Sequence, residues 1–194
     1  MNKFIREIIE TIILGLLLFL AIQFSLQNYR VEGSSMSPTI EGGQHLIVNK
    51  LIYTSLPNWP LLRNIPFIEI DTNNRIYLFR TPNKDDIIVF KPPLDHKRDF
   101  VKRVIGIPGD TVAILDGTLF INAKPQNESY IQKSIDGNML PQKVMDGSYF
   151  VLGDNRPSSN DSRKWGLVPA ENIIGISWFS YWPIKQLDVF QIFQ

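Results

Sequence analysis

Cysteine is absent from this chain of 194 residues, and histidine occurs only at positions 45 and 96. The lack of cysteine excludes disulfide bonds, thiolate catalysis and cysteine-ligated zinc. His96 lies in the charged segment PLDHKRD and is expected to be solvated, and nothing marks His45 as half of a catalytic pair. Few ligands remain for a metal, so the sequence predicts neither a metal site nor a cofactor.

A block of charge of one sign is also missing. The formal net charge is +1, and the basic residues are not clustered, so nucleic acid is not an expected partner. Hydrophobic residues make up 44% of the chain and charged residues 20%, which is sufficient for a packed core. The length fits one domain, or one domain with a short appendage.

Long apolar runs are absent as well, with one exception. Nineteen uncharged residues, TIILGLLLFLAIQFSLQNY, lie between Glu10 and Arg30. As a helix they would span roughly 28 Å, close to the thickness of a bilayer's hydrocarbon core, and apolar residues cover every face. A cleaved signal peptide and a buried core helix are the alternatives, but Ala21 has Phe19 two places before it and no small-x-small cleavage site is evident. We interpret residues 1–29 as a cytoplasmic end and an uncleaved transmembrane anchor.

The charges around this segment predict its orientation. Lys3 and Arg6 favour a cytoplasmic amino terminus, although Arg30 weakens the contrast across the segment. No second segment is long enough to span a bilayer. The expected protein is thus a single-pass protein of the plasma membrane, with residues 30–194 forming one extracytoplasmic domain.

Strand signals dominate the rest of the chain. Asp116-Gly117 predicts a tight hairpin turn, and no long amphipathic helix pattern follows the anchor. A mainly β domain is therefore expected, with insertions at about 53–84 and 123–147. The β-branched and aromatic runs are HLIVNKLI (45–52), DIIVFK (86–91), FVKRVIGI (100–107), TVAIL (111–115), TLFIN (118–122), SYFVLG (148–153) and IIGISWFSYW (173–182).

Several apolar side chains leave open whether they contact lipid or cover the β core. The interface between membrane and water favours tryptophan, whereas a core would bury the same side chains. These residues are Trp59, Leu61, Leu62, Ile65 and Phe67 in the first insertion, and Trp178 and Trp182 near the carboxyl end.

With histidine set aside, a catalytic serine would need lysine as its base. A lysine at its reference pKa of about 10.4 is almost fully protonated near pH 7, but burial among apolar side chains lowers that pKa. Lys102, in DFVKRVIGIPGD, lies in such a run, and strand alternation places it on the face of Phe100 and Val104. Periodicity alone leaves open an ordinary lysine on an exposed face.

A polar stretch, GDNRPSSNDSRKWG at 153–166, follows the apolar run SYFVL directly. It offers Asp161 and Arg163 for a charge-assisted pair, together with hydroxyls that could orient a neutral amine.

Taken in order behind the anchor, SSMSPTI (34–40), DDIIVF (85–90), FVKRVIGIPGD (100–110) and GDNRPSSNDSRKWG resemble bacterial type I signal peptidases, the membrane-anchored Ser/Lys proteases. The resemblance covers nearly the whole chain and implies a mainly β catalytic domain. It also implies cleavage of signal peptides from exported preproteins by acyl transfer. The implied partners are those signal peptides and the lipid bilayer, with the translocation machinery as a candidate.

The resemblance also implies roles for single residues. Ser35, followed by Met-x-Pro, matches the nucleophile, and Lys102 matches the general base. Ser159 matches the serine that hydrogen-bonds the lysine, and Asp161 and Arg163 match the supporting charged pair. Some members have an oxyanion-binding serine two places before the nucleophile. This chain has Gly33 there, so backbone N–H groups must contribute more.

The position of Ser35 suits a substrate embedded in the membrane. Ser35 lies nine positions after Leu26, so it is no more than about 30 Å from the end of the apolar segment. If the flanking strands line the site, residues −1 and −3 of an extended substrate meet shallow, uncharged walls that select small side chains. The predicted walls are formed by Val31, Met36, Ile40, Phe100 and Val101.

Three alternatives remain open on the sequence. Self-cleaving repressors of the SOS response use a Ser/Lys pair, but they carry a DNA-binding domain where this chain has its apolar segment. An inactive membrane-tethered β scaffold would not need both Ser35 and Lys102. A processing peptidase specialised for one secretion substrate would carry the same residues.

Overall fold

The computed structural model describes residues 3–53, 55–56, 69–70, 76–77, 79–133 and 137–190. Most of the first predicted insertion lies outside these ranges. So do the side chains for which lipid contact was considered there, namely Trp59, Leu61, Leu62, Ile65 and Phe67. Of the other two, Trp178 packs against the core and Trp182 is exposed.

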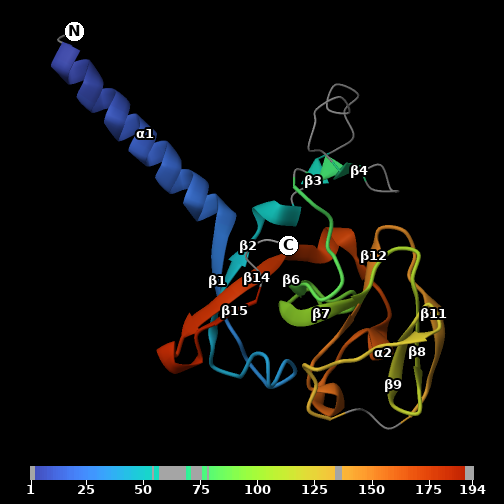
Figure 1. Cartoon of the computed structure of the whole chain (residues 1–194). Helices are drawn as coiled ribbons and strands as arrows, with labels where there is room; N and C mark the ends of the chain where they lie inside the picture. The colour runs from blue at the N-terminus through green and yellow to red at the C-terminus, as the bar shows by residue number, and fades with distance from the viewer. Residues whose placement is uncertain are drawn as a thin grey trace.

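A single long helix, α1 (Lys3–Ser25), projects from the β domain and has no buried residue (Figure 1). Within the described residues it is the one helix that is long and apolar enough to cross a membrane. Its end differs from the sequence prediction, which extended the anchor to residue 29. The chain leaves the helix after Ser25, and Leu26–Arg30 forms strand β1. Pairing with the neighbouring strand β2 provides the backbone hydrogen bonds of Leu26–Arg30 that a continuing helix would otherwise supply.

The largest sheet has eight strands and contains the site described below. Its order is β1-β2-β14-β6-β7-β12-β13, with β15 paired to β14, and every pairing is antiparallel. After β1, its strands are β2 (His45–Asn49), β6 (Ile87–Phe90), β7 (Phe100–Gly106), β12 (Ser148–Leu152), β13 (Val168–Pro169), β14 (Ile173–Trp182) and β15 (Asp188–Val189).

A second sheet lies beside the first, with the order β10-β9-β8-β11 (Figure 1). Its strands are β8 (Thr111–Leu115), β9 (Thr118–Ile121), β10 (Lys124–Pro125) and β11 (Met139–Lys143). Asp116 and Gly117 join β8 to β9 with φ angles of 46° and 76°, which confirms the predicted hairpin turn. Three two-residue strands, β3 (Ser55–Leu56), β4 (Glu69–Ile70) and β5 (Ile76–Tyr77), form a small third sheet.

Three apolar clusters fill the domain. One lies on the face of β6 and β7 that carries Ile88 and Val104, and another lies on the opposite face with Val89. The third lies against the second sheet and includes Val112 and Leu119. The predicted mainly β class is confirmed, and each of the seven predicted runs contains a strand.

Candidate active site

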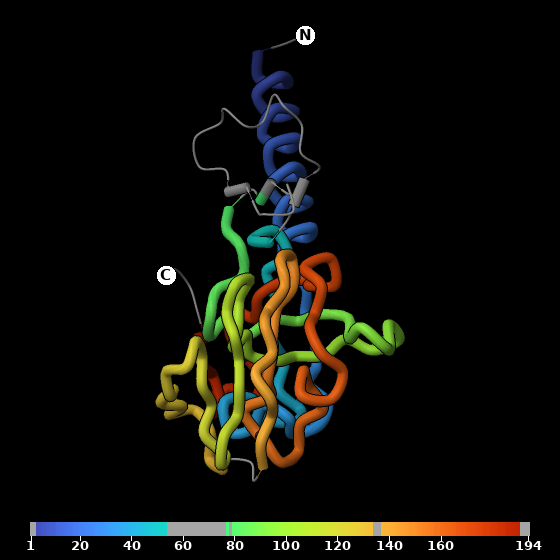
Figure 2. Tube along the Cα trace, turned by 90° about the vertical axis from the view of Figure 1, so that its right-hand side faces the viewer, coloured from blue at the N-terminus to red at the C-terminus, as the bar shows by residue number. Residues whose placement is uncertain are grey.

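Ser35 lies in a turn that follows β1, and buried apolar neighbours hold this turn in place. Met36 and Ile40 are 1% and 0% exposed, and the Ile40 N–H donates to the Met36 carbonyl at 2.9 Å. Gly33 has a φ of +82°, a conformation that favours glycine. In Figure 2 the blue segment with this turn lies at the end of the domain away from α1, with β1 in between. Ser35 itself remains half-buried.

Lys102 reaches this serine from the middle of β7. Its Nζ lies 2.6 Å from Ser35 Oγ and 2.7 Å from the Val101 carbonyl oxygen. The residue is only 3% exposed, and the Phe100 ring centroid is 5.4 Å from Nζ, as strand alternation predicted. Burial lowers the pKa of Lys102 from its ordinary value of 10.5 to about 8, against the opposing charges of Asp161 and Asp154. A substantial neutral fraction is therefore present at mildly alkaline pH.

The polar loop 153–163 packs against the serine turn from the other side. Asn155 donates through its backbone N–H to the Ser35 carbonyl and through Nδ2 to the Ser34 carbonyl, each at 3.0 Å. A Cβ at Gly153 would overlap the Ser35 carbonyl and the Ser159 hydroxyl, so glycine is required for this approach. Close contact between backbones thus fixes the loop to the turn.

Ser159 is buried in this loop beside Gly153. Its Oγ has no hydrogen-bond partner within the described residues, so no hydrogen bond joins it to Lys102. The hydroxyl therefore has unused hydrogen-bonding capacity at a fully buried position.

Asp161 and Arg163 form the ion pair that the sequence predicted. Arg163 Nε and Nη2 donate to the two carboxylate oxygens of Asp161 at 2.7 and 2.8 Å, and Asp161 is completely buried. Asp161 also accepts the backbone N–H of Gly153 at 3.1 Å. The pair therefore holds the loop where it contacts the serine turn.

A second ion pair beside the site was missed from the sequence. Arg103 donates to both carboxylate oxygens of Asp154, at 2.9 and 2.6 Å, and the Thr39 hydroxyl donates to the same carboxylate at 2.6 Å. The strand of Lys102, the polar loop and the serine turn are thereby joined. Arg103 directly follows Lys102 and Asp154 directly follows Gly153, so each lies beside a residue of the site. The two are 51 positions apart, however, and the sequence does not indicate that they pair.

A cleft of about 620 Å³ opens beside Ser35 and Lys102. Of the five predicted wall residues, Val31, Phe100 and Val101 line it. Met36 and Ile40 do not, because they are buried in the core behind the turn. The walls are also more polar than predicted, since the lining includes the charged residues Arg30, Glu32, Arg98 and Asp99.

This arrangement can support acyl transfer. A serine hydroxyl in contact with a buried amine of lowered pKa forms a pair of nucleophile and general base. Within the described residues, no group of three or more His, Asp or Glu side chains could hold a metal ion.

Comparison with known proteins matches the chain as a whole to one family. The family described as "Signal peptidase, peptidase S26" matches residues 5–182. A signal peptidase I of Leptolyngbya laminosa is 37% identical over 191 residues, covering 94% of this chain and 82% of that protein. One from Bacillus caldolyticus is 40% identical over 177 residues, covering 84% and 83%. A crystal structure of a signal peptidase I from Enterococcus faecalis has 35% identity and a TM-score of 0.44, covering 50% of this chain and 97% of that one.

Proposed function

The chain belongs to the signal peptidase family, peptidase S26, and from this premise we propose that it is a serine endopeptidase that cleaves signal peptides from preproteins. One observation carries the assignment of the site: Ser35 Oγ lies 2.6 Å from the Nζ of a lysine that is 3% exposed. Ser35 is the proposed nucleophile and Lys102 the proposed general base.

The proposed reaction has two stages. Neutral Lys102 accepts the proton of Ser35, whose Oγ attacks the scissile carbonyl, and the lysine then protonates the leaving amine. The signal peptide remains as an ester on Ser35. Water that gives its proton to the same lysine attacks this ester and releases the signal peptide.

Supporting groups hold the reacting atoms rather than react. The Ser35 backbone N–H is the proposed oxyanion donor, since Gly33 has no side chain to contribute. Asp161 and Arg163 hold the polar loop against the turn. The buried hydroxyl of Ser159 is proposed to orient the lysine amine once substrate closes the site, although the two groups are not hydrogen-bonded in this structure.

The same proposal includes the location of the protein. Helix α1 would anchor it in the plasma membrane with the amino terminus cytoplasmic and the β domain outside. The lipid bilayer and the translocation machinery are then its expected surroundings.

Trapping the acyl-enzyme tests the function. The full chain in detergent micelles is mixed with a preprotein that has alanine at −3 and −1. The reaction is quenched in acid, and the peptides of the enzyme are weighed by mass spectrometry. We expect the mass of the signal peptide on Ser35, and a loss of cleavage of at least about 10³-fold in both Ser35→Ala and Lys102→Met. Ser34→Ala is the matched control and should remain active. Residual cleavage of several per cent in Ser35→Ala, or acylation of another serine, would contradict the assignment.

A further inference from the structure

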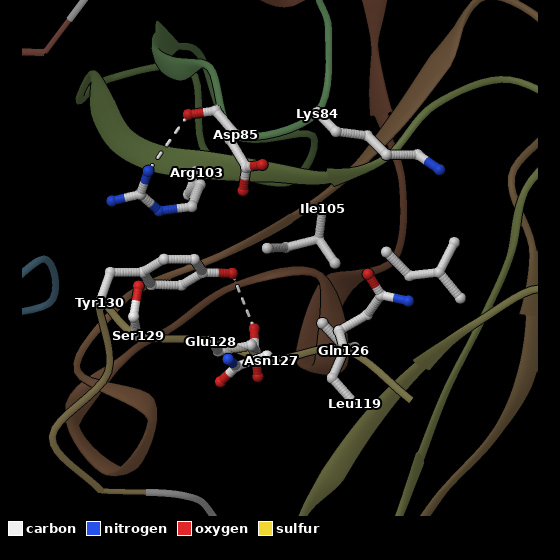
Figure 3. Close-up of a pocket in the computed structure, with 11 residues that line it drawn as sticks. Lys84, Asp85, Arg103, Ile105, Leu119, Gln126, Asn127, Glu128, Ser129 and Tyr130 are labelled. Atoms are coloured by element: carbon white, nitrogen blue, oxygen red, sulfur yellow. Dashed lines mark hydrogen bonds between the residues drawn. The ribbon is translucent and has the colours of Figure 1, made fainter. Parts of the chain in front are cut away.

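A short segment between β10 and β11, residues 126–131, reaches from the second sheet to the site. We call it the strap. Gln126 anchors it by donating its backbone N–H to the Leu119 carbonyl of β9 at 2.9 Å. Figure 3 shows Glu128 and Tyr130 of the strap facing a cavity that Arg103 and Asp85 border from the other side. Neither strap residue lines the cleft beside Ser35.

Glu128 pairs with Arg156 of the polar loop. Arg156 Nη1 donates to Glu128 Oε2 at 2.9 Å, and Nη2 contacts Oε1, with only 3% and 5% of the two side chains exposed. The same arginine donates through Nε to the Gly153 carbonyl at 3.1 Å. Its own carbonyl accepts Arg163 Nη2 at 2.7 Å. The Glu128 carboxylate therefore fixes the arginine that holds the backbone of the loop.

Tyr130 contacts a second arginine. Its hydroxyl donates to Glu128 Oε1 at 2.8 Å, and its ring lies 4.1 Å from the guanidinium carbon of Arg103 (Figure 3). Arg103 follows Lys102 in β7 and pairs with Asp154. One strap thus contacts one arginine on the strand of the lysine and another on the loop that packs against the serine turn.

We propose that Glu128 and Tyr130 are positioning residues for cleavage. The strap holds β7 and the polar loop at the spacing that keeps the Lys102 amine shielded from water and next to Ser35. This inference rests on the proposed function. A buried ion pair adds little net stability compared with apolar residues of similar volume, but it fixes geometry. The strap holds one arginine on the strand of Lys102 and another on the polar loop, which matches that use.

Loosening the strap should change how Lys102 titrates. Burial lowers the pKa of Lys102, and the facing carboxylates Asp161 and Asp154 raise it. When the loop moves away, water reaches the amine and the lowering by burial is partly lost. Asp161 and Asp154 belong to the same loop, so their raising effect weakens as well, but burial is the larger of the two effects. The apparent pKa on the acid side of the rate profile would therefore rise. If this pKa rises by one, the rate at pH values well below the pKa falls tenfold.

The test is the dependence of kcat/KM on pH between 6 and 10, with the full chain in detergent micelles and rates normalised to the folded fraction. Glu128→Gln should lose about tenfold at pH 7 and recover most of its rate near pH 10. Tyr130→Phe keeps the ring over Arg103 and loses the hydroxyl, so we expect about a threefold loss with the same recovery. Asp146→Asn removes one exposed carboxylate from the same insertion and should match the wild type.

Exchanging the pair sharpens the result. Glu128→Arg combined with Arg156→Glu should restore part of the rate that either single change removes. If the loss of rate in Glu128→Gln and in Tyr130→Phe does not change with pH, the strap has a merely structural role and the inference is overturned. A wild type that fails to cleave preprotein would instead overturn the proposed function. If Glu128→Gln does not fold, the Tyr130→Phe profile decides.

Discussion

The two larger sheets bury different kinds of side chain. Around the site, the first sheet and its polar loop bury charges and hydroxyls, whereas the second sheet buries an apolar cluster and has the buried carboxylate of Asp110 at its edge. The buried polar groups of the site are Lys102, Arg103, Asp154, Arg156, Ser159 and Asp161. The cluster of the second sheet includes Val112, Ile114, Leu119, Ile121 and Val144.

The difference separates two uses of burial. Apolar burial stabilises the fold in proportion to area, whereas burying a charge is unfavourable unless partners surround it. Arg103, Arg156 and Arg163 each have a carboxylate partner. Within the described part of the chain no carboxylate forms an ion pair with Lys102, whose Nζ hydrogen-bonds to a hydroxyl and a carbonyl. The site therefore keeps one uncompensated amine, which is the property that a lysine base requires.

Breaking a charge pair of the site should have the largest effect on stability. Asp154→Asn leaves the Arg103 guanidinium buried without its opposing charge and weakens both of its bonds to this residue, and should lower the free energy of unfolding by about 3 kcal/mol. Urea denaturation of the full chain in micelles measures this. Lys91→Ala is the control, because its pair with Asp99 is largely exposed and should contribute under about 1 kcal/mol. Equal losses in the two variants would argue that burial of the site pair has no special cost.

Removing the uncompensated amine should stabilise the protein. The folded pKa of about 8 lies below the ordinary 10.5, so the folded state binds fewer protons between these values and stability rises with pH in that window. Below pH 8 the full penalty, at most about 3 kcal/mol, is present. Lys102→Met should therefore raise the free energy of unfolding at pH 7, and the gain should shrink as pH approaches 10.5. A gain that does not vary with pH would contradict the assigned cause.

A cavity in the second sheet should lower stability without changing the chemistry. Val112 is fully buried, so Val112→Ala should lower the free energy of unfolding by about 2 kcal/mol. The pH dependence of cleavage per folded molecule should stay at the wild-type profile, because the residue lies in the second sheet's cluster. A shifted profile would show that the second sheet tunes Lys102 directly.

The hairpin turn should show the smallest effect. Gly117 has a φ of 76°, so Gly117→Ala should lower the free energy of unfolding by about 1 kcal/mol. Thermal unfolding measures this, with Thr118→Ala as a neighbour that has no positive φ. A loss of cleavage beyond the loss of folded protein would link this turn to the site.

The sequence predicts best where the signal is local. The strand runs, the 116–117 turn and the placement of Lys102 on the Phe100 face all depend on spacing within a few residues, and the structure agrees with them. Spacing alone did not decide whether Lys102 is buried. The segment interpreted as the anchor reached residue 29, whereas α1 ends at Ser25, because an uncharged run does not distinguish a helix from the edge strand β1. The segment MLPQK lacks strand alternation, yet it pairs with β8 as β11.

Contacts between distant segments could not be predicted in this way. Arg103 meets Asp154 across 51 positions, and Arg156 meets Glu128 across 28, with nothing in either local sequence that names the partner. Met36 and Ile40 show a related limit. Their apolar character and their place beside Ser35 predicted that they form walls of the cleft, but only the fold shows that they face the core instead.

The central claim is that Lys102 is a desolvated base for Ser35, and the pH dependence of the acylation rate tests it most directly. The rate of acyl-enzyme formation is measured by rapid acid quench from pH 6 to 10.5 with one preprotein. We predict a tenfold rise per pH unit at low pH, an apparent pKa near 8 and a plateau above it. A rate that keeps rising tenfold per unit to pH 10 would mean that the amine titrates as an exposed lysine, and would contradict the account.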